Sequence, residues 1–532
     1  MREAIKNIFS QDLEALKSRE DLEVLKRRLC KEYGLKSISN SEILEEYRRE
    51  KASGREFPAN FLALLRKRSI RTMSGIAPVA VLTKPYPCPG SCAYCPHEKE
   101  VPVSYLSNEP AVMRAIRCSY DPYRQTISRL RSLEANGHQP EKIELIVIGG
   151  TWSYLPTKYK YWFILNCFKA ANDFSVFRKN KFLATIKIPS SPYRLASKIE
   201  ELRACLKKEQ RKNETAAYRL VGLTLETRPD YLDDREVEEM RSLGCTRVEI
   251  GVQAPDDQIL KINKRGHGVL AISEATEKLR NRGFKITYHL MPGLPGSSPK
   301  KDLELFKQLF SDERFQPDQI KFYPTVVTKG SLLYRWYNQG KYQPYTDKQL
   351  EDLIIACKLA VPDYVRIIRL IRDIPSESII AGNKITNLRQ IMQQRGVKCR
   401  CIRCREVKDS SSDKQPHLNI EKYQAAGGQE FFISFVGADN FTLYGFCRLR
   451  LGAGMPFSAI IRELHVYGEL APLGKKKLVQ HQGLGRLLLK EAENIASQGN
   501  CRELAVISGV GVRDYYRKQG YRLRDGYMCK KL

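Results

Sequence analysis

Short apolar runs alternate with longer helical stretches between about residue 76 and residue 330. Each run has the composition of a buried parallel strand and ends in a polar turn, which predicts six βα units. In chain order the runs are GIAPVAVLT, KIELIVIGG, RLVGLTLET, TRVEIGVQ, KITYHLMPG and QIKFYPTVV. We therefore predict an α/β fold built around a partial (β/α)6 barrel, with its chemistry at the C-terminal ends of the strands.

The pattern changes on both sides of this barrel. In DLEALKSREDLEVLKRRLCKEYG, Leu recurs at steps of three and four residues, which predicts a helical, basic N-terminal region at 1–75. The barrel would span 76–390, and clustered cysteines followed by a polar stretch predict a connector at 391–428. The last segment, 429–532, has strands, a glycine-containing turn that opens a helix, and a final strand and helix. A chain of 532 residues is long enough for several such domains.

The chain is strongly basic, with 90 Lys and Arg against 60 Asp and Glu and a formal net charge of +30. A solvated basic surface is the plain explanation, but an excess of this size favours a polyanionic partner, and we expect nucleic acid. No run of about 18 apolar residues is present, and the first residues lack the apolar stretch of a secretion signal. We therefore expect a cytoplasmic protein with no membrane span. Its 15 cysteines would be thiols and metal ligands rather than disulfides.

Three cysteines, Cys88, Cys92 and Cys95, form a C-x3-C-x2-C run in the loop after the first predicted strand. A structural zinc site needs four closed ligands, and an ordinary iron–sulfur cluster also takes four cysteines. Three thiolates on a 4Fe–4S cluster leave one iron open to an external ligand with an amine and a carboxylate. The spacing resembles the signature of the radical S-adenosylmethionine enzymes. This resemblance implies a 4Fe–4S cluster and S-adenosylmethionine, and zinc is the alternative.

Two further features fit the same resemblance. The turn after the second strand, Gly149, Gly150 and Thr151, resembles the family's turn for the methionine amino group. Glu226 and Gln253, late in later strands, would reach the ribose or the methionine carboxylate. The alternatives are a plain tight turn and ordinary polar strand ends.

Near the C-terminus, Gln480, Gly483 and Gly485 form a Q-x-x-G-x-G turn directly before a helix. Glycines let the backbone approach a pyrophosphate, and a helix N-terminus offers free amides and a favourable dipole. With a strand before it and an aromatic-rich helix after it, this ending resembles the GNAT acetyltransferase fold. The resemblance implies a tyrosine hydroxyl that protonates the leaving thiolate of a thioester. We favour Tyr516 over Tyr515, and either tyrosine could instead be a core aromatic.

The two halves together resemble the Elongator catalytic subunit family, the tRNA wobble-uridine acetyltransferases. Matching stretches include EPAVMRAIR, LETRPDYL, CTRVEIGVQ, FYPTVV, RELHVYG and VISGVGVRDYYRKQGYR, from about residue 60 to residue 532. The resemblance implies that acetyl-CoA and radical chemistry place a carboxymethyl group on carbon 5 of the wobble uridine. A radical is needed because an unactivated methyl group is too weak an acid for base chemistry. The acetyl-CoA contacts carried over by motif are Lys142, Glu463, Leu464, His465, Val466, Leu484, Gly485, Arg486 and Tyr516.

A second cluster, Cys399, Cys401 and Cys404, has spacing typical of zinc thiolates, with three unmetallated thiols as the alternative. Two candidates for the fourth ligand stay open: His417 and a residue from another domain. The tight spacing of the first cluster is typical of bacterial or archaeal relatives. A need for accessory Elongator subunits, and a homodimer, both stay open.

Basic residues in three segments would line a path for the anticodon stem-loop of tRNA, whose unstacked bases are the usual target of specific readers. They are Arg66, Lys67, Arg68, Arg71, Lys261, Lys264, Arg265, Arg366, Arg369 and Arg372. Each could instead be solvated or ion-paired. Two rival functions also stay open: a protein lysine acetyltransferase with a scaffold barrel, and a non-catalytic tRNA-binding platform.

Overall fold

The computed structural model describes residues 1–58, 60–65, 75–179, 188–385, 388–407, 416–452, 456–467 and 483–532. Its centre is a seven-stranded parallel sheet in the order β1-β2-β3-β4-β5-β6-β8. The strands are β1 (Ile76–Leu82), β2 (Lys142–Ile148), β3 (Arg219–Thr227), β4 (Arg247–Gln253), β5 (Lys285–Leu290), β6 (Gln319–Phe322) and β8 (Arg366–Arg369). All six predicted strands are present, and β8 extends the sheet by one strand beyond the (β/α)6 prediction.

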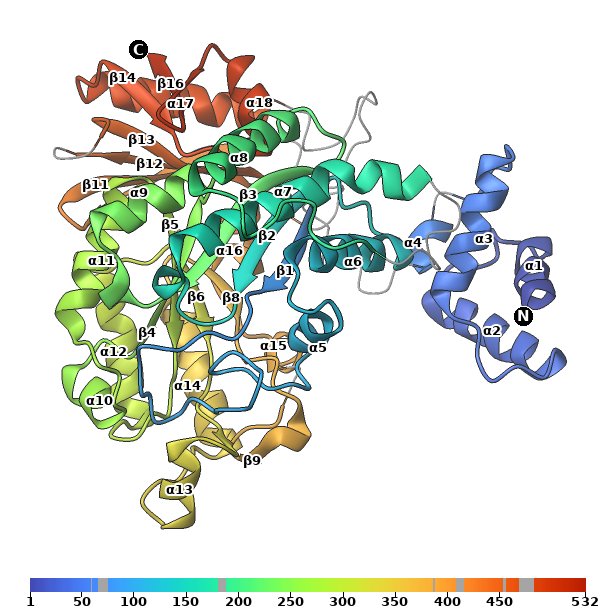
Figure 1. Ribbon diagram of the computed structural model, residues 1–532, viewed down its shortest axis with the longest axis horizontal. Coiled ribbons are helices and arrows are strands. Elements are labelled where there is room, and N and C mark those ends of the chain that lie inside the picture. Colours follow the sequence, from blue (N-terminus) through green and yellow to red (C-terminus); the bar gives the residue numbers. More distant parts are fainter. Residues whose placement is uncertain are drawn as a thin grey trace.

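Most helices of this region lie around the sheet, and their buried apolar residues join those of the strands in one core (Figure 1). Several start at a clear signal: Asp121 caps α6 and Ser298 caps α12, and each is followed by proline at the first helical position. The helices of this region are α5 (Pro110–Arg117), α6 (Pro122–Ala135), α7 (Thr157–Lys179), α8 (Ile199–Asn213), α9 (Asp234–Ser242), α10 (Asp257–Ile262), α11 (Val269–Asn281), α12 (Pro299–Ser311), α13 (Leu332–Asn338), α14 (Asp347–Ala360), α15 (Leu388–Gln394) and α16 (Ile402–Arg405).

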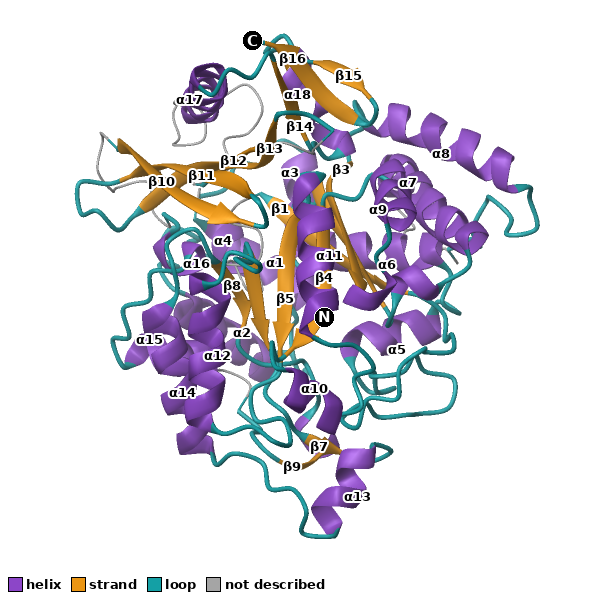
Figure 2. Ribbon diagram, turned by 90° about the vertical axis from the view of Figure 1, so that its left-hand side faces the viewer, coloured by secondary structure: helices purple, strands orange, loops and turns teal. Residues whose placement is uncertain are grey.

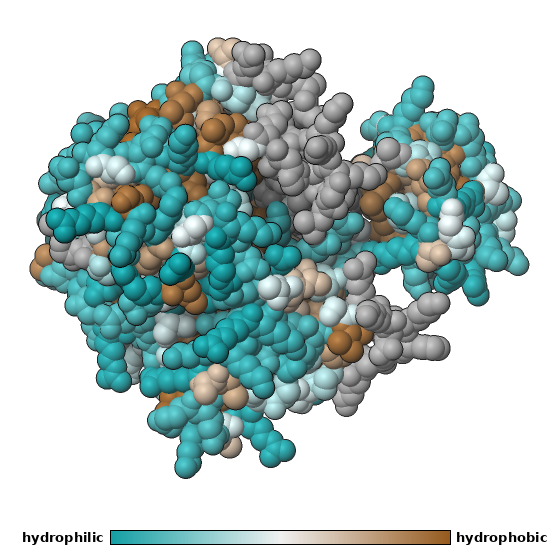
Figure 3. Space-filling model, turned by 90° about the horizontal axis from the view of Figure 1, so that it is seen from above, coloured by the Kyte–Doolittle hydropathy of each residue, from teal (hydrophilic) through white to brown (hydrophobic). Residues whose placement is uncertain are grey.

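The N-terminal helices form a lobe with its own apolar core, centred on residues such as Phe9, Leu22 and Phe61. They are α1 (Arg2–Ser10), α2 (Arg19–Glu32), α3 (Asn40–Ala52) and α4 (Phe61–Leu65). Seen from above, this lobe projects from one side of the molecule, and the surface in view is mostly hydrophilic (Figure 3). The predicted helical N-terminal region is therefore present.

The C-terminal region is a second seven-stranded sheet in the order β10-β11-β12-β13-β14-β16-β15, in which only β13 and β14 pair in parallel. Its strands are β10 (His417–Ala425), β11 (Gly428–Val436), β12 (Leu443–Leu451), β13 (Ala459–Val466), β14 (Glu503–Val506), β15 (Arg522–Arg524) and β16 (Tyr527–Lys531). Helix α17 (Leu484–Gln498) packs on β11, β12 and β13, and α18 (Arg513–Arg517) follows β14. The boundary predicted at 428 is corrected, because β10 pairs with β11 along its whole length and belongs to this sheet.

The C-terminal sheet lies across the amino ends of the barrel strands, and the loops after their carboxyl ends lie at the opposite end of the molecule (Figure 2). Ion pairs join the two sheets: Asp318, just before β6, forms a buried pair with Arg462 of β13, and Lys285 of β5 forms a part-buried pair with Glu463. A two-stranded ladder, β7 (Val327–Thr328) with β9 (Ile379–Ala381), lies near α13 at the carboxyl end. Among the described helices, none is long and apolar enough to cross a membrane.

Candidate functional site

The three-cysteine loop follows β1 and lies at the carboxyl end of the barrel. Cys92 is buried, and Arg265 donates to its sulfur from Nη1 at 3.3 Å. A second guanidinium, that of Arg228, lies 3.9 Å from the same sulfur. A hydrogen bond with Cys95, and then the charges of Arg265 and Arg228, lower the pKa of Cys92 to about 4 despite its burial. The loop therefore presents a thiolate, which is the form that binds metals.

Both arginines are fixed by other contacts. Arg228 forms a two-pronged ion pair with Asp230 at 2.7 and 2.9 Å and donates to the carbonyl of Arg265 at 2.7 Å. Arg265 in turn donates to the carbonyl of Gly251 at 2.7 Å. Gly90 of the loop packs so closely on Arg228 that a Cβ there would lie 2.2 Å from the guanidinium. The loop is thus held against two buried cations.

The donor set of this loop can be compared with that of a closed zinc site. Tetrahedral zinc with bonds of about 2.3 Å needs its sulfurs about 3.8 Å apart. Among the described residues, the sulfurs of Cys88, Cys92 and Cys95 do not all lie within 4.8 Å of one another, unlike those of the second cysteine cluster. The loop thus offers an open set of three thiols rather than a closed zinc site, which fits a 4Fe–4S cluster that keeps one iron free.

The turn after β2 lies beside this loop. Gly149 has a φ of +129°, and a Cβ there would lie 2.2 Å from the hydroxyl of Thr83, so only glycine fits. Thr83, which follows β1, donates its amide to the carbonyl of Ile148 at 3.0 Å. Gly150 also has a positive φ, and Thr151 precedes a 3-10 turn at Trp152–Tyr154. The predicted Gly149–Thr151 turn and the cysteine loop therefore lie at the same edge.

Glu226 and Gln253 lie at the carboxyl ends of β3 and β4, as predicted. Glu226 accepts a hydrogen bond from the hydroxyl of Tyr105 at 3.1 Å. Gln253 has a φ of +69°, and its buried Oε1 has no hydrogen-bond partner among the described residues. The positive φ strains the backbone of Gln253, and its buried oxygen lacks a partner within the described part of the chain. Both features are typical of a ligand-binding residue. These side chains fit a polar cofactor such as S-adenosylmethionine.

Buried charged side chains continue from this edge into the barrel. His289 of β5 contacts Glu249 of β4 at 2.8 Å and Glu226 at 3.5 Å. Lys321 of β6 pairs with the same Glu249. Although burial opposes it, the charge of Lys321 and a hydrogen bond with His289 hold the pKa of Glu249 well below its ordinary value. The barrel interior is therefore polar and charged rather than a purely apolar core.

The C-terminal sheet has an open edge. Strand β14 pairs with β13 only from Ala459 to Ile461, and among the described residues no strand pairs with this edge at 463–466. Helix α17 begins beside it after Gly483, whose φ is +79°. A Cβ on Gly485 would lie 3.6 Å from Val466 and 3.0 Å from the hydroxyl of Tyr515. A free strand edge next to a helix N-terminus is suited to an extended ligand with a phosphate group.

Only some of the residues predicted to bind acetyl-CoA lie at this edge. The backbone at 464–466 and the helix start at Leu484–Arg486 border it, whereas the Glu463 carboxylate pairs with Lys285 and Arg448 at the domain junction. Lys142 begins β2 at the amino end of the barrel. Burial, and then nearby cations including Lys142, lower the pKa of His465 to about 3. Gln480 lies outside the described residues.

The two tyrosines differ in exposure. Tyr516 is 6% exposed and lies in the apolar core of the sheet, whereas Tyr515 is 38% exposed and faces Gly485. Burial raises the pKa of both phenols, which keeps each in the protonated form. Which hydroxyl serves as the acid stays a prediction.

Comparison with known proteins places the chain in a family. The model of the radical S-adenosylmethionine superfamily matches residues 86–309, and that of the radical S-adenosylmethionine C-terminal domain matches 317–396. The tRNA uridine(34) acetyltransferase of Dehalococcoides mccartyi is 44% identical over 485 residues, covering 88% of this chain and all of that protein. Elongator complex protein 3 of Homo sapiens is 37% identical, covering 88% of this chain and 86% of the relative. The chain belongs to the Elongator complex protein 3 family.

A solved structure agrees with this assignment. Elp3 of the archaeon Methanocaldococcus infernus, lacking its residues 1–46, superimposes with a TM-score of 0.71 at 37% identity. The match covers 87% of this chain and all of that one. The predicted family and the radical S-adenosylmethionine half-barrel are confirmed, and with them a 4Fe–4S cluster and S-adenosylmethionine as cofactors.

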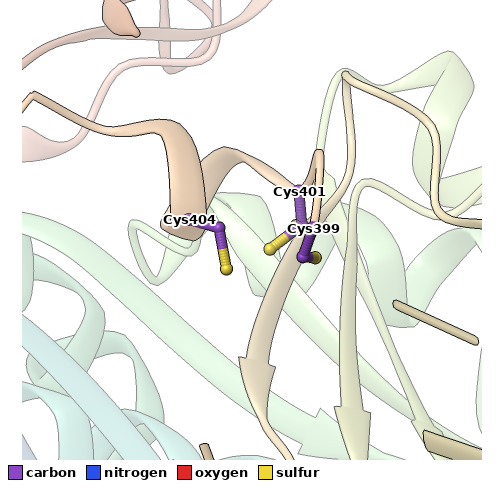
Figure 4. A group of neighbouring side chains, drawn as sticks. All are labelled: Cys399, Cys401 and Cys404. Carbon is purple, nitrogen blue, oxygen red and sulfur yellow. The ribbon is translucent and has the colours of Figure 1, made fainter. Parts of the chain in front are cut away.

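This member of the Elongator complex protein 3 family also has a second cysteine cluster. The sulfurs of Cys399, Cys401 and Cys404 all lie within 4.8 Å of one another, around the start of α16 (Figure 4). Hydrogen bonds from the other two thiols hold the pKa of Cys401 well below its ordinary value. Lys358 donates to the Cys404 sulfur at 3.6 Å. The three thiols would supply three of the four ligands of one zinc ion, and His417 does not join the group.

The predicted RNA-binding residues differ in exposure, and some lie outside the described residues. Lys261 and Lys264 are exposed, and Arg66, Lys67, Arg68 and Arg71 lie outside the described residues. Arg265 is 6% exposed, so its predicted RNA contact is wrong: its charge faces Cys92 instead.

The three remaining arginines belong to or follow β8. Arg366 faces inward to Glu406 and the hydroxyl of Tyr467, each at 2.9 Å, and Arg372 contacts Ser104 and Glu109. For these two the RNA contact stays a prediction, and both part-exposed guanidinium groups already have partners within the protein. Arg369 is exposed and pairs with Asp373.

Sequence reasoning missed several residues of the site. Arg228 and Asp230 lie in LETRPDYL, a stretch that indicated the family but not the roles of these residues. Tyr105 and His289 belong to none of the motifs described above. A charged residue inside an otherwise apolar strand, such as Glu249 or Lys321, was the one available signal, because burial of a charge requires a partner.

Proposed function

We propose that this protein modifies the wobble uridine of tRNA, using acetyl-CoA and S-adenosylmethionine to place a carboxymethyl group on carbon 5. The observation that carries the proposal is the three-cysteine loop, held against two buried arginines at the barrel's carboxyl end, in a chain whose relatives are named tRNA uridine(34) acetyltransferases. The protein would act in the cytoplasm, where tRNA is found.

We assign roles to this chain's own residues at the cluster end. Cys88, Cys92 and Cys95 would hold the 4Fe–4S cluster, and the turn at Gly149, Gly150 and Thr151 would receive the amino group of S-adenosylmethionine. Glu226, oriented by Tyr105, and Gln253, through its unpartnered oxygen, would hold the rest of that cofactor. When bound, the two groups supply radical chemistry that can remove hydrogen from an unactivated methyl group.

We place acetyl-CoA at the open edge of the C-terminal sheet. The free backbone at 464–466 would pair with the extended pantetheine arm, and the amides that open α17 would receive the pyrophosphate. Tyr516, or the more exposed Tyr515, would protonate the departing thiolate. The domains would be a helical region at 1–75, a barrel to about 390, a connector, and a GNAT-type domain that starts with β10 at 417.

The proposal is tested by reconstituting the protein with iron and sulfide under anaerobic conditions. Acetyl-CoA, S-adenosylmethionine and tRNA are then added, and the digested nucleosides are analysed by mass spectrometry. We expect a mass gain on the wobble uridine that matches one carboxymethyl group and requires all three substrates. No mass gain in the presence of an intact cluster and bound tRNA would overturn the proposal.

Two rival functions predict different results in the same assay. A lysine acetyltransferase would consume acetyl-CoA on basic peptides without tRNA or the cluster. A tRNA-binding platform would keep its function after Cys92→Ser or Tyr516→Phe. We expect both substitutions to stop product formation.

We also propose that the second cluster binds one structural zinc ion. Purified protein should contain one zinc per chain by elemental analysis, and Cys401→Ser should lose it. The free energy of unfolding should fall by about 3 kcal/mol or more, since metal-binding energy becomes folding energy in such sites.

Cys30→Ser is the control for the zinc substitution, because Cys30 is a lone, partly exposed thiol in the N-terminal lobe. It should leave the zinc content unchanged. Wild-type protein that is free of zinc yet equally stable would identify the cluster as three plain thiols.

A further inference from the structure

A pocket of about 370 Å³ lies beside the cysteine loop, outside the site assigned above. Its walls include the side chains of Trp336, Tyr342, Tyr345, Ile262 and Lys341. Three aromatic rings and one cation are a composition suited to a flat, anionic ligand. The volume is at the lower end of the range for small-ligand pockets, which corresponds to a group of nucleobase size.

The aromatic walls are held in place before any ligand arrives. The hydroxyl of Tyr342 donates to the carbonyl of Gly293 at 2.7 Å, and that of Tyr345 donates to Asp302 at 2.8 Å. Because the phenols are tied down, little side-chain entropy would be lost when a base stacks on these rings.

Hydrogen bonds connect the segments around the pocket to the cysteine loop. Leu333 of α13, the helix that carries Trp336, donates its amide to the carbonyl of Ala93 at 2.7 Å. Asn263, next to Ile262 of the pocket lining, donates to the carbonyl of Pro295 at 2.9 Å and accepts from the amide of Ala93 at 3.0 Å. Trp336, Tyr342 and Cys92 belong to one apolar cluster. A ligand in the pocket would therefore be held at a fixed distance from the cysteine loop.

The rim of the pocket is basic. Lys341 lines it, and Lys261 and Lys264 flank the segment that contributes Ile262. All three lysines are exposed, and none forms an ion pair with a described residue. Free cations around an aromatic pocket match the chemistry of single-stranded RNA, in which bases stack on rings and phosphates are neutralised by lysine.

We propose that this pocket binds one unpaired base of the RNA substrate, next to the uridine that enters the barrel. The inference rests on the proposed function, because it takes tRNA as the substrate. Trp336 would stack on the base, and Lys341 would neutralise an adjacent phosphate. A base fixed here would set which nucleotide of the loop faces the cluster.

The test measures the affinity of the full chain for a fluorescent anticodon stem-loop RNA at several salt concentrations. Trp336→Ala should weaken binding at least about fivefold with no change in the salt slope, because stacking involves no counterion release. Trp336→Phe should restore most of the affinity. Lys341→Ala should instead reduce the slope of log affinity against log salt by about 0.7. Lys207→Ala, an exposed charge on α8, should change neither value.

A second RNA checks that an unpaired base is the ligand. Trp336→Ala should not weaken binding of a fully paired duplex. The iron content of each variant shows whether the cysteine loop is still folded. If wild-type protein modifies tRNA and Trp336→Ala binds the stem-loop as tightly as wild type, the pocket is not a base site and an apolar peptide becomes the better occupant. If wild-type protein neither binds nor modifies tRNA, the proposed function fails together with this inference.

Discussion

Replacing Arg265 with glutamine is expected to remove the iron–sulfur cluster while leaving tRNA affinity unchanged. Arg265 donates to the Cys92 sulfur and is buried, so its loss leaves a thiolate without its nearest cation. Breaking a buried charge pair costs about 3–5 kcal/mol, which corresponds to a loss of cluster affinity of roughly 100-fold or more. Iron content and visible absorption after anaerobic reconstitution measure the effect, and product formation should fall in parallel.

The matched control is Lys264→Gln, one residue earlier in the chain. Lys264 is exposed and makes no ion pair with a described residue. We expect this variant to keep its cluster and to lower the salt slope of tRNA binding by about 0.7 to 0.9. If Arg265→Gln instead kept full iron and lowered the salt slope, the assignment of Arg265 to the cluster loop would be wrong.

The contrast between these neighbours shows what a charge pattern can and cannot reveal. Arg265 and Lys264 look alike in NKRGH, but only the fold tells that one faces Cys92 and the other faces solvent. Exposure is decided by segments far apart in sequence, here the cysteine loop and the end of α10. Local composition does not report such contacts.

Strands were predictable where the apolar run was continuous. KIELIVIGG and TRVEIGVQ gave β2 and β4 because a parallel strand covered on both faces needs apolar residues throughout. β8 was missed because its sequence, RIIR, has arginine at both ends, and these guanidinium groups find partners within the protein and at its surface. β10 was missed because most of its side chains are exposed or half-buried, so it resembles a polar connector.

The cysteine motif was predictable for a different reason. All three cysteine ligands lie in one short loop, so their spacing is visible directly in the sequence. The cations that lower the thiol pKa, Arg228 and Arg265, follow β3 and α10, and no local sequence pattern marks them. A site built by several strand ends is therefore only partly visible in any one stretch of sequence.

The second large effect is expected at the junction of the two sheets. Asp318 is fully buried, accepts from Arg462 Nη1 at 2.9 Å and lies 3.5 Å from Arg448 Nη1. Asp318→Asn leaves these cations without their shared counterion and should lower the free energy of unfolding by about 3–5 kcal/mol. Asp312→Asn, which breaks a local pair with the exposed Arg314, should cost about 1 kcal/mol or less. Denaturant midpoints of the full chain measure both values.

The effect of Asp318 should also depend on pH in one direction. Burial alone would raise the pKa of this carboxyl, but the charges of Arg462, Arg448 and Arg280 outweigh it and hold the pKa below its ordinary value. A carboxyl with a lowered pKa stabilises the fold fully above its unfolded pKa of about 3.9, and this contribution is lost as the pH falls toward the folded value. The gap between wild type and Asp318→Asn should therefore be widest above about pH 5 and should narrow below about pH 4. A gap that stays constant down to pH 3 would show that Asp318 acts through packing and not through its charge.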